Sequence, residues 1–172
     1  MKSMQIRAAR ASDGPAILEI ILPVIREGAT YTLDPDMGAA EALAYWLSSD
    51  KETFVAEDDN VILGTYFIRP NQAGGGRHVC NCGYMTRTAA VGRGVARSMC
   101  QHSLAHARER GYRAMQFNFV VSTNERAVRL WQSLGFEIVG RLPAAFRHPT
   151  QGYVDVFVMY QQLQDAAPPS TD

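Results

Sequence analysis

A short glycine-rich segment near the middle of the chain has the pattern of a phosphate-binding turn. The segment Thr88–Ala96 reads TAAVGRGVA, follows a strand-like run and opens a helical one. Gly92 and Gly94 lack a Cβ, so the backbone there can approach a ligand closely. The first N–H groups of the next helix have no partner within it and carry partial positive charge, which favours a diphosphate. Arg93 and Arg97 would add charge from the sides; the alternative is a tight turn that binds nothing.

Two other nucleotide-binding motifs fit this segment poorly. A Rossmann unit places its glycine turn after the first strand, with a third glycine and an acidic residue further on. Here the turn lies near the middle of the chain and the third glycine is missing. A Walker A loop needs lysine after its last glycine, and the segment has none. A diphosphate with a long arm along the preceding strand fits better, although an α/β domain for ATP or NAD is an alternative.

The hydrophobic pattern predicts the elements that position this turn. A β-α-β unit made of 78–87, 95–110 and 114–121 makes its two strands parallel neighbours. A length of 172 residues favours a single domain, 1–164, with a polar tail at 165–172 that we expect to be disordered. The other expected strands are 4–9, 53–57, 61–69, 137–142 and 153–161, and the other expected helices are 12–27, 37–49 and 124–134.

A second segment carries a more specific pattern. Residues Asn124–Phe136 read NERAVRLWQSLGF. Together with the turn Val91–Ala96, this segment resembles the two signatures of the GNAT superfamily of N-acetyltransferases. These are Gln/Arg-x-x-Gly-x-Gly/Ala and Asn-x-x-Ala-x-x-Leu-Tyr-x-x-x-Gly-Phe, and the order of elements also matches from about residue 61 to 160. The second signature is matched by Asn124, Ala127, Leu130, Gly135 and Phe136.

The resemblance implies an α/β (α+β) fold with a mixed, mostly antiparallel sheet of about seven strands and about four flanking helices. The fourth and fifth strands would splay apart, with acetyl-CoA as co-substrate in the gap between them and no metal. The resemblance also implies the coenzyme contacts. The diphosphate would lie on Val91, Gly92, Arg93, Gly94, Val95 and Ala96, the pantetheine arm beside Tyr84, Met85 and Thr86, and further contacts would come from Asn124 and Trp131.

Two positions depart from the family pattern. Val91 replaces the usual Gln or Arg. This replacement should weaken phosphate binding little if backbone amides hold the phosphates. Trp131 occupies the place of a tyrosine that commonly serves as general acid near the CoA sulfur. Indole supplies no titratable proton, so the thiolate would leave unassisted or take a proton from water or another residue. A catalytically silent acyl-CoA-binding module is therefore an alternative to an enzyme.

Three asparagines suggest the acceptor. Asn81, Asn118 and Asn124, with the run FNFVVSTN at 117–124, are similar to acetyltransferases that act on proline analogues such as azetidine-2-carboxylate. The run GATYTLDP at 28–35 is similar to phosphinothricin-type acetyltransferases. Both groups acetylate small amines that resemble amino acids.

The expected chemistry is direct attack of the amine on the thioester, but the strand 78–87 offers no carboxylate as general base. Asparagine is not a base, although its amide can orient water or bind a carboxylate. We expect a water held by Asn81, Asn118 or Asn124 to carry the proton away, with Asn118 and Asn124 as the catalytic candidates. We also expect Asn81 and Asn118 to contact the acceptor. The alternatives are backbone hydrogen bonds for Asn81 and Asn118, and a helix N-cap for Asn124.

Two loops are expected to wall the acceptor pocket. Tyr31 lies in an early loop at 28–36, and Phe146 lies in the segment 143–152, which reads as a long loop between the last two strands. Arg147, His148 and Tyr153 are further candidates in or beside that loop. Both loops could close the site, which favours a small amine over the alternative acceptor, a protein N-terminus or lysine.

Composition excludes several other classes. The formal net charge is zero at pH 7, which argues against nucleic acid as a partner. No apolar run reaches the roughly 18 residues of a membrane helix, and the first residues lack the apolar core of a signal peptide. The odd number of cysteines, Cys80, Cys82 and Cys100, indicates reduced thiols in the cytoplasm rather than disulfides or zinc. The last two strands could pair in a homodimer.

Overall fold

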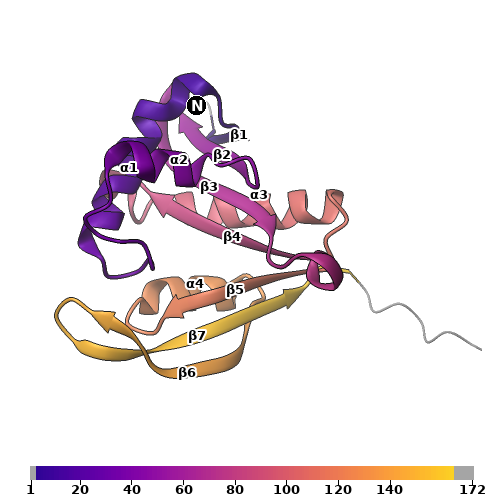
Figure 1. Ribbon diagram of the computed structural model, residues 1–172. Coiled ribbons are helices and arrows are strands. Elements are labelled where there is room, and N and C mark those ends of the chain that lie inside the picture. Colours follow the sequence, from indigo (N-terminus) through magenta and orange to yellow (C-terminus); the bar gives the residue numbers. More distant parts are fainter. Residues whose placement is uncertain (1–2, 165–172) are drawn as a thin grey trace, which may run out of the picture.

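The computed structural model describes residues 3–164 and contains the predicted seven strands and four α-helices in the predicted order (Figure 1). The expected tail at 165–172 lies outside the described residues. Within residues 3–164, no helix is both long enough and apolar enough to span a membrane. The elements are β1 Gln5–Ala8, α1 Gly14–Glu27, α2 Ala39–Trp46, β2 Glu52–Asp58, β3 Val61–Pro70, β4 Val79–Thr86, α3 Val95–Glu109, β5 Ala114–Val121, α4 Glu125–Ser133, β6 Glu137–His148 and β7 Gly152–Gln162.

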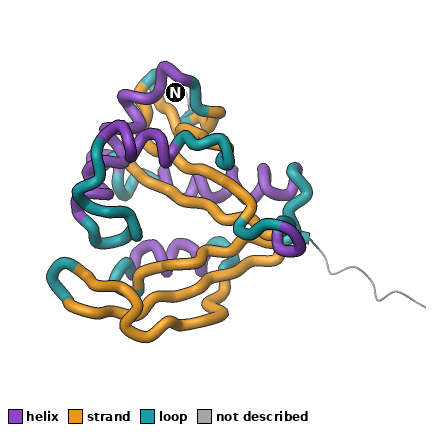
Figure 2. The backbone as a smooth tube through the Cα atoms, viewed as in Figure 1, coloured by secondary structure: helices purple, strands orange, loops and turns teal. Residues whose placement is uncertain are grey.

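The seven strands form a single sheet that opens in its middle. Their order is β1-β2-β3-β4-β5-β7-β6, and all neighbours are antiparallel except β4 and β5. The parallel pair is joined only at its base, where Val79 pairs with Ala114 and Cys80 with Met115. Beyond these two pairs the strands diverge, and the two parts of the sheet fan apart (Figures 1 and 2). The predicted splay of the fourth and fifth strands is therefore confirmed.

Helices cover both faces of the sheet and create two cores. Helices α3 and α4 pack on one face, where Met99 and Trp131 meet Tyr66 and Phe117. Helices α1 and α2 pack on the other face, with Ile17, Trp46, Phe67 and Met85 among the residues of that core. Because side chains alternate along a strand, Cys82 and Tyr84 of β4 point toward α3 and α4, whereas Met85 points toward α1 and α2. Asn81 and Gly83 lie on the same face of β4 as Met85.

The segment predicted as a long loop at 143–152 is mostly strand, so that prediction was wrong. Strand β6 continues to His148 and pairs with β7 as far as Gly152, which leaves a short turn at residues 149–151. The pairing is interrupted between Leu142 and Phe146 by a bulge in which Ala144 has a φ of 49°. Such a bulge also accommodates Pro143, which has no N–H to give to the ladder.

Candidate active site

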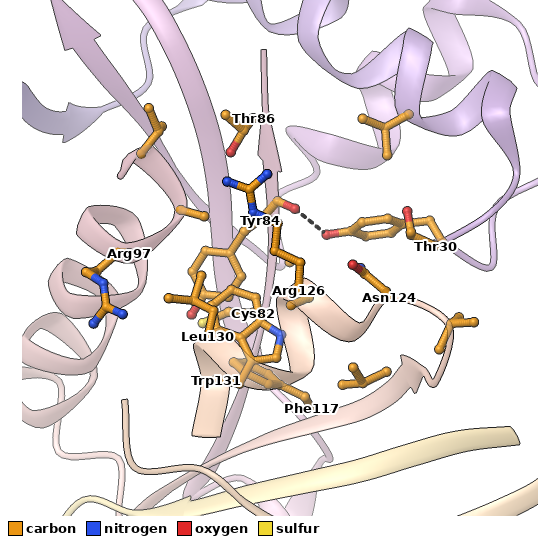
Figure 3. A pocket seen from close by; sticks show the side chains of 18 of the residues that line it. Thr30, Cys82, Tyr84, Thr86, Arg97, Phe117, Asn124, Arg126, Leu130 and Trp131 are labelled. Carbon is orange, nitrogen blue, oxygen red and sulfur yellow. Dashed lines mark hydrogen bonds between the residues drawn. The ribbon is translucent and has the colours of Figure 1, made fainter. Parts of the chain in front are cut away.

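A pocket of about 790 Å³ passes through the sheet at the gap between β4 and β5 (Figure 3). On one face of the sheet it is lined by residues that pack with α3 and α4, such as Phe117 and Trp131. On the other face it is lined by residues that pack with α1 and α2, such as Tyr31 and Phe67. Two molecules that enter from opposite faces would therefore meet between the two strands.

The predicted phosphate-binding turn forms one end of this pocket. Gly92 and Gly94 have φ values of 89° and 80°, in the left-handed region that favours glycine. Gly94 is the N-cap of α3 and has no side chain that could bond to the first amides of the helix. Its carbonyl oxygen accepts a hydrogen bond from the amide of Ser98 at 3.0 Å. The N–H groups of the first turn of α3 are therefore available to an anion. Pocket-lining residues in this turn are Val91, Gly92, Gly94, Val95 and Ala96.

The charged side chains at this end differ from the expected pair. Arg93 does not line the pocket, because its guanidinium turns toward the Asp58 carboxylate, 3.5 Å away. Arg97 lines the pocket and donates a hydrogen bond to Ser133 Oγ at 3.0 Å. Arg126 of α4 also lines the pocket, and a Cβ placed on Gly92 would lie 3.3 Å from its Nη2 atom. Its position next to the turn depends on the packing of α4, so sequence reasoning missed it.

The main chain of β4 presents polar groups to the gap. The amide of Arg87 donates to the carbonyl oxygen of Leu63 in β3, at 2.7 Å. Since N–H and C=O groups alternate sides along an antiparallel strand, the groups of Met85 also face β3, whereas those of Tyr84 and Thr86 face the gap. The hydroxyl of Tyr31 donates to the Tyr84 carbonyl oxygen at 2.9 Å, which agrees with this alternation. Tyr84 and Thr86 line the pocket; Met85 does not, and its side chain is buried.

Aromatic rings form the wall where the pocket crosses the sheet. Trp131 is 8% exposed, and its ring centroid lies 5.0 Å from that of Tyr84 and 5.2 Å from that of Phe117. The hydroxyl of Tyr84 lies 2.6 Å from Ser103 Oγ, beneath α3, and burial raises the pKa of this hydroxyl. Neither Trp131 nor Tyr84 therefore offers a mobile proton to the pocket at neutral pH.

Two of the three asparagines are held by hydrogen bonds. Asn81 donates from Nδ2 to the carbonyl oxygen of Gln116 at 2.9 Å, so the backbone-bonding alternative applies to this residue. Asn118 donates to Asn71 Oδ1 at 2.6 Å and accepts from Gln116 Nε2 at 2.9 Å. Both line the pocket on the face of α1 and α2.

Asn124 differs from the other two asparagines. It precedes α4 in the N-cap position but makes no side-chain capping bond, so the capping alternative does not describe it. Its amide points into the pocket (Figure 3). Asn124 is therefore the asparagine whose side chain is most available to a substrate or a water.

The opposite end of the pocket is an aromatic chamber. A cation lines it, and a second cation outside the lining, Lys51, has its Nζ 4.3 Å from the Tyr45 ring centroid. Tyr31, Tyr45 and Phe67 line it, together with Arg69 at the end of β3. The guanidinium of Arg69 lies 5.6 Å from the Phe67 ring centroid and 3.5 Å from the carboxylate of Asp50. Sequence reasoning missed Arg69, because its approach to the pocket depends on the register between β3 and β4.

The expected contribution of the last hairpin was wrong. Phe146 does not line the pocket; its ring packs edge-on against Phe119, with centroids 6.2 Å apart, and it is Phe119 that reaches the wall. Arg147, His148 and Tyr153 do not line the pocket either, and Tyr153 is 70% exposed.

The loop between α1 and α2 lies close to the tip of the β6–β7 hairpin. A Cβ placed on Gly28 would lie 3.0 Å from Pro35 of its own loop and 4.0 Å from Pro149 of the hairpin. Tyr31 fastens the same loop to β4 through the Tyr84 carbonyl oxygen. Thr30, Tyr31 and Thr32 of this loop line the pocket.

The titratable groups of the pocket carry little capacity for proton transfer. The described residues that line it include no Asp, Glu, His or Lys, and its permanent charges are Arg69, Arg97, Arg126 and Arg129. Burial raises the pKa of Tyr31 and of the Cys82 thiol above their usual values. No side chain of the described lining is therefore suited to accept a proton from an amine near neutral pH. Cys80, Cys82 and Cys100 are all free and buried.

Comparison with known proteins gives consistent matches. The model of the acetyltransferase (GNAT) family matches residues 21–136. The solved structure of a GCN5-related N-acetyltransferase from Kribbella flavida is 43% identical, with a TM-score of 0.89 over 92% of this chain and 97% of that one.

Two curated proteins are also similar. The N-acetyltransferase aca1 of Schizosaccharomyces pombe is 29% identical over 83% of this chain and 78% of its own. The L-amino acid N-acyltransferase MnaT of Escherichia coli is 25% identical over 96% of this chain and 98% of its own. Both alignments extend well beyond the two sequence signatures.

Proposed function

The chain belongs to the acetyltransferase (GNAT) family, and from that premise we propose that it transfers the acetyl group of acetyl-CoA to a small amine that carries a carboxylate, such as an amino acid. One observation carries this proposal. A single pocket crosses the sheet, with a glycine turn suited to a diphosphate at one end and a chamber containing Arg69 at the other.

The coenzyme half of the pocket fits the parts of acetyl-CoA in order. The diphosphate would lie on the turn Val91–Ala96, where glycine and free amide groups permit close approach. The pantetheine arm would extend β4 by hydrogen bonding to the main chain of Tyr84 and Thr86, with Trp131 as its wall. When bound, acetyl-CoA supplies an activated acetyl thioester in the gap.

The chain's own groups would then orient the reaction. The N–H of Tyr84 faces the gap and can donate to the thioester oxygen as negative charge develops there. The amine forms its bond to the acetyl carbon as the carbon–sulfur bond breaks, and the thiolate takes its proton from solvent. A water held by Asn124, with Asn118 nearby in the lining, receives the proton that the amine loses. Close placement of both substrates supplies much of the rate.

Charge and shape support an acceptor with a carboxylate. Arg69 is the cation among the described residues that line the aromatic chamber, and guanidinium pairs with carboxylates through two parallel hydrogen bonds. The described lining has no acidic side chain that would bind a polyamine, and the contact between the Gly28 loop and Pro149 disfavours a long peptide. The similarity to an enzyme named L-amino acid N-acyltransferase supports the same class.

The test is CoA release from acetyl-CoA with four groups of acceptors: amino acids, their carboxamides, polyamines and short peptides. We expect release with at least one amino acid or cyclic imino acid, and much less with the carboxamide of the same compound. Faster release with peptides or polyamines would refute the acceptor class. Tight acetyl-CoA binding without release from any acceptor would support the silent binding module that Trp131 also permits.

A further inference from the structure

Arg126 occupies an unusual place for a cation. It is the second residue of α4, and the positive end of a helix dipole disfavours a cation in the first turn. Its guanidinium reaches the glycine turn that precedes α3, where a second helix contributes partial positive charge. Figure 3 shows Arg126 extending from α4 across the pocket toward Tyr84 and Thr86.

The neighbouring arginines of the pocket have partners that Arg126 lacks. Arg97 donates to Ser133 Oγ, and Arg129 lies 4.0 Å from the carboxylate of Glu125, four residues earlier on α4. In residues 3–164, Arg126 has no ion pair or side-chain hydrogen bond, and it is exposed to the pocket. Its position therefore does not stabilise the fold through a contact of its own.

The glycine turn leaves room for this arginine. A Cβ on Gly92 would lie 3.3 Å from Nη2 of Arg126, which is tighter than an ordinary contact, so a side chain at residue 92 would displace the guanidinium. The N-terminal amides of α3 and the guanidinium of Arg126 thus both lie at the glycine turn, in a pocket whose described lining has no acidic residue. A ligand with two adjacent negative charges would relieve the repulsion between them.

We propose that Arg126 is a binding residue for the coenzyme, which reaches across the pocket from α4 and holds the diphosphate on the side opposite the amides of α3. This inference rests on the proposed function, since the diphosphate belongs to acetyl-CoA. It replaces Arg93, whose side chain turns toward Asp58, as the expected lateral cation. Arg126 then determines affinity for the nucleotide half of the coenzyme and leaves the pantetheine half and the chemistry unaffected.

The test measures Kd by calorimetry for CoA and, by competition, for pantetheine, which has no phosphate. Arg126→Ala should raise the Kd for CoA about 10-fold and leave that for pantetheine unchanged, because only charge-assisted bonds to phosphate are lost. The Kd of Arg126→Lys for CoA should lie between those of the wild type and Arg126→Ala, since an ammonium gives a point charge in place of the planar guanidinium. Arg77→Ala is the charge-matched control. Arg77 is exposed and precedes β4, at the opposite end of that strand from the glycine turn. Its replacement should change the Kd for CoA by less than about twofold.

Two results would overturn the inference. One is Arg126→Ala protein that binds CoA as tightly as wild type. The other is an equal loss of CoA and pantetheine binding, which would indicate a distorted cleft and not a lost phosphate contact. Wild-type protein that fails to bind CoA would overturn the proposed function itself, so the two failures are distinguishable.

Discussion

The side-chain amide of Asn81 donates to the main-chain carbonyl oxygen of Gln116 at 2.9 Å, directly beyond the last paired residues of β4 and β5. Cys80 and Met115 form that last pair. From there the strands separate and the pocket begins. The side chain of Asn81 therefore makes one further hydrogen bond between the two strands, at the point where the sheet opens.

Replacing Asn81 should loosen this point. Asn81→Ala leaves the Gln116 carbonyl oxygen without its partner, and we expect a loss of about 1–3 kcal/mol in the free energy of unfolding, measured in urea. Asn81→Asp should cost at least as much, because an ionised carboxylate cannot donate to a carbonyl oxygen. CoA affinity should fall in both variants. Asn118→Ala is the comparison, because Asn118 is exposed and bonds to side chains; equal loss in both alanine variants would contradict the special role of Asn81.

Tyr31 should affect binding of the acceptor and not binding of the coenzyme. Tyr31→Phe removes the hydroxyl that donates to Tyr84 but keeps the ring packed edge-on to Trp46, with centroids 6.3 Å apart. We expect a stability loss of about 1 kcal/mol and an acceptor KM raised by roughly 3- to 10-fold, because the loop at 28–38 is no longer fastened to β4. The Kd for CoA should stay unchanged; a larger effect on CoA than on acceptor would contradict this assignment.

Arg69 should distinguish an amino acid from its carboxamide. Arg69→Gln should raise the KM of the amino acid by about 10- to 100-fold and change that of the carboxamide little, because only the former loses a charge-assisted contact. Asp50→Asn is the matched control. It removes the carboxylate 3.5 Å from Arg69 and should not raise the KM of the amino acid. An equal effect of Arg69→Gln on both acceptors would place the carboxylate elsewhere.

The pH dependence of kcat/KM should reflect the ionisation of the acceptor amine. Burial raises the pKa of Tyr31, Tyr84 and Cys82, and arginines stay protonated, so none of these groups loses a proton between about pH 6 and 8. As pH rises, kcat/KM should increase about tenfold per unit until the acceptor amine is neutral. Glycine should show this rise, whereas aminooxyacetate, with its weakly basic amine, should show a flat profile. A shared inflection near neutral pH for both acceptors would reveal a general base on the protein.

Local signals predicted much of this molecule. The glycine turn, the start of α3 and the hairpin between β2 and β3 depend on residues adjacent in sequence, and each was expected within a few residues of its observed place. The segment 143–152 was misread because the end of β6 is an edge strand, exposed along most of its length, so it shows no alternating apolar pattern. Pro143 and the largely polar run at 147–151 also resemble a loop.

Two charged residues of the site, Arg69 and Arg126, could not be found in this way. Arg69 reaches the pocket through the register of β3 against β4, and Arg126 through the packing of α4 across the gap. Neither relationship leaves a pattern in the surrounding sequence. Arg93 was expected in the pocket because it lies between the two glycines, but the turn directs its side chain toward Asp58.

The most direct test of the central claim, that both substrates meet in one pocket, is an initial-rate experiment with acetyl-CoA and the best amino-acid acceptor varied together. Direct transfer predicts reciprocal plots that intersect. Parallel lines would contradict the account, because they would require an acetylated enzyme. Cys82 is the thiol in the described lining, and burial raises its pKa, which makes it a poor nucleophile.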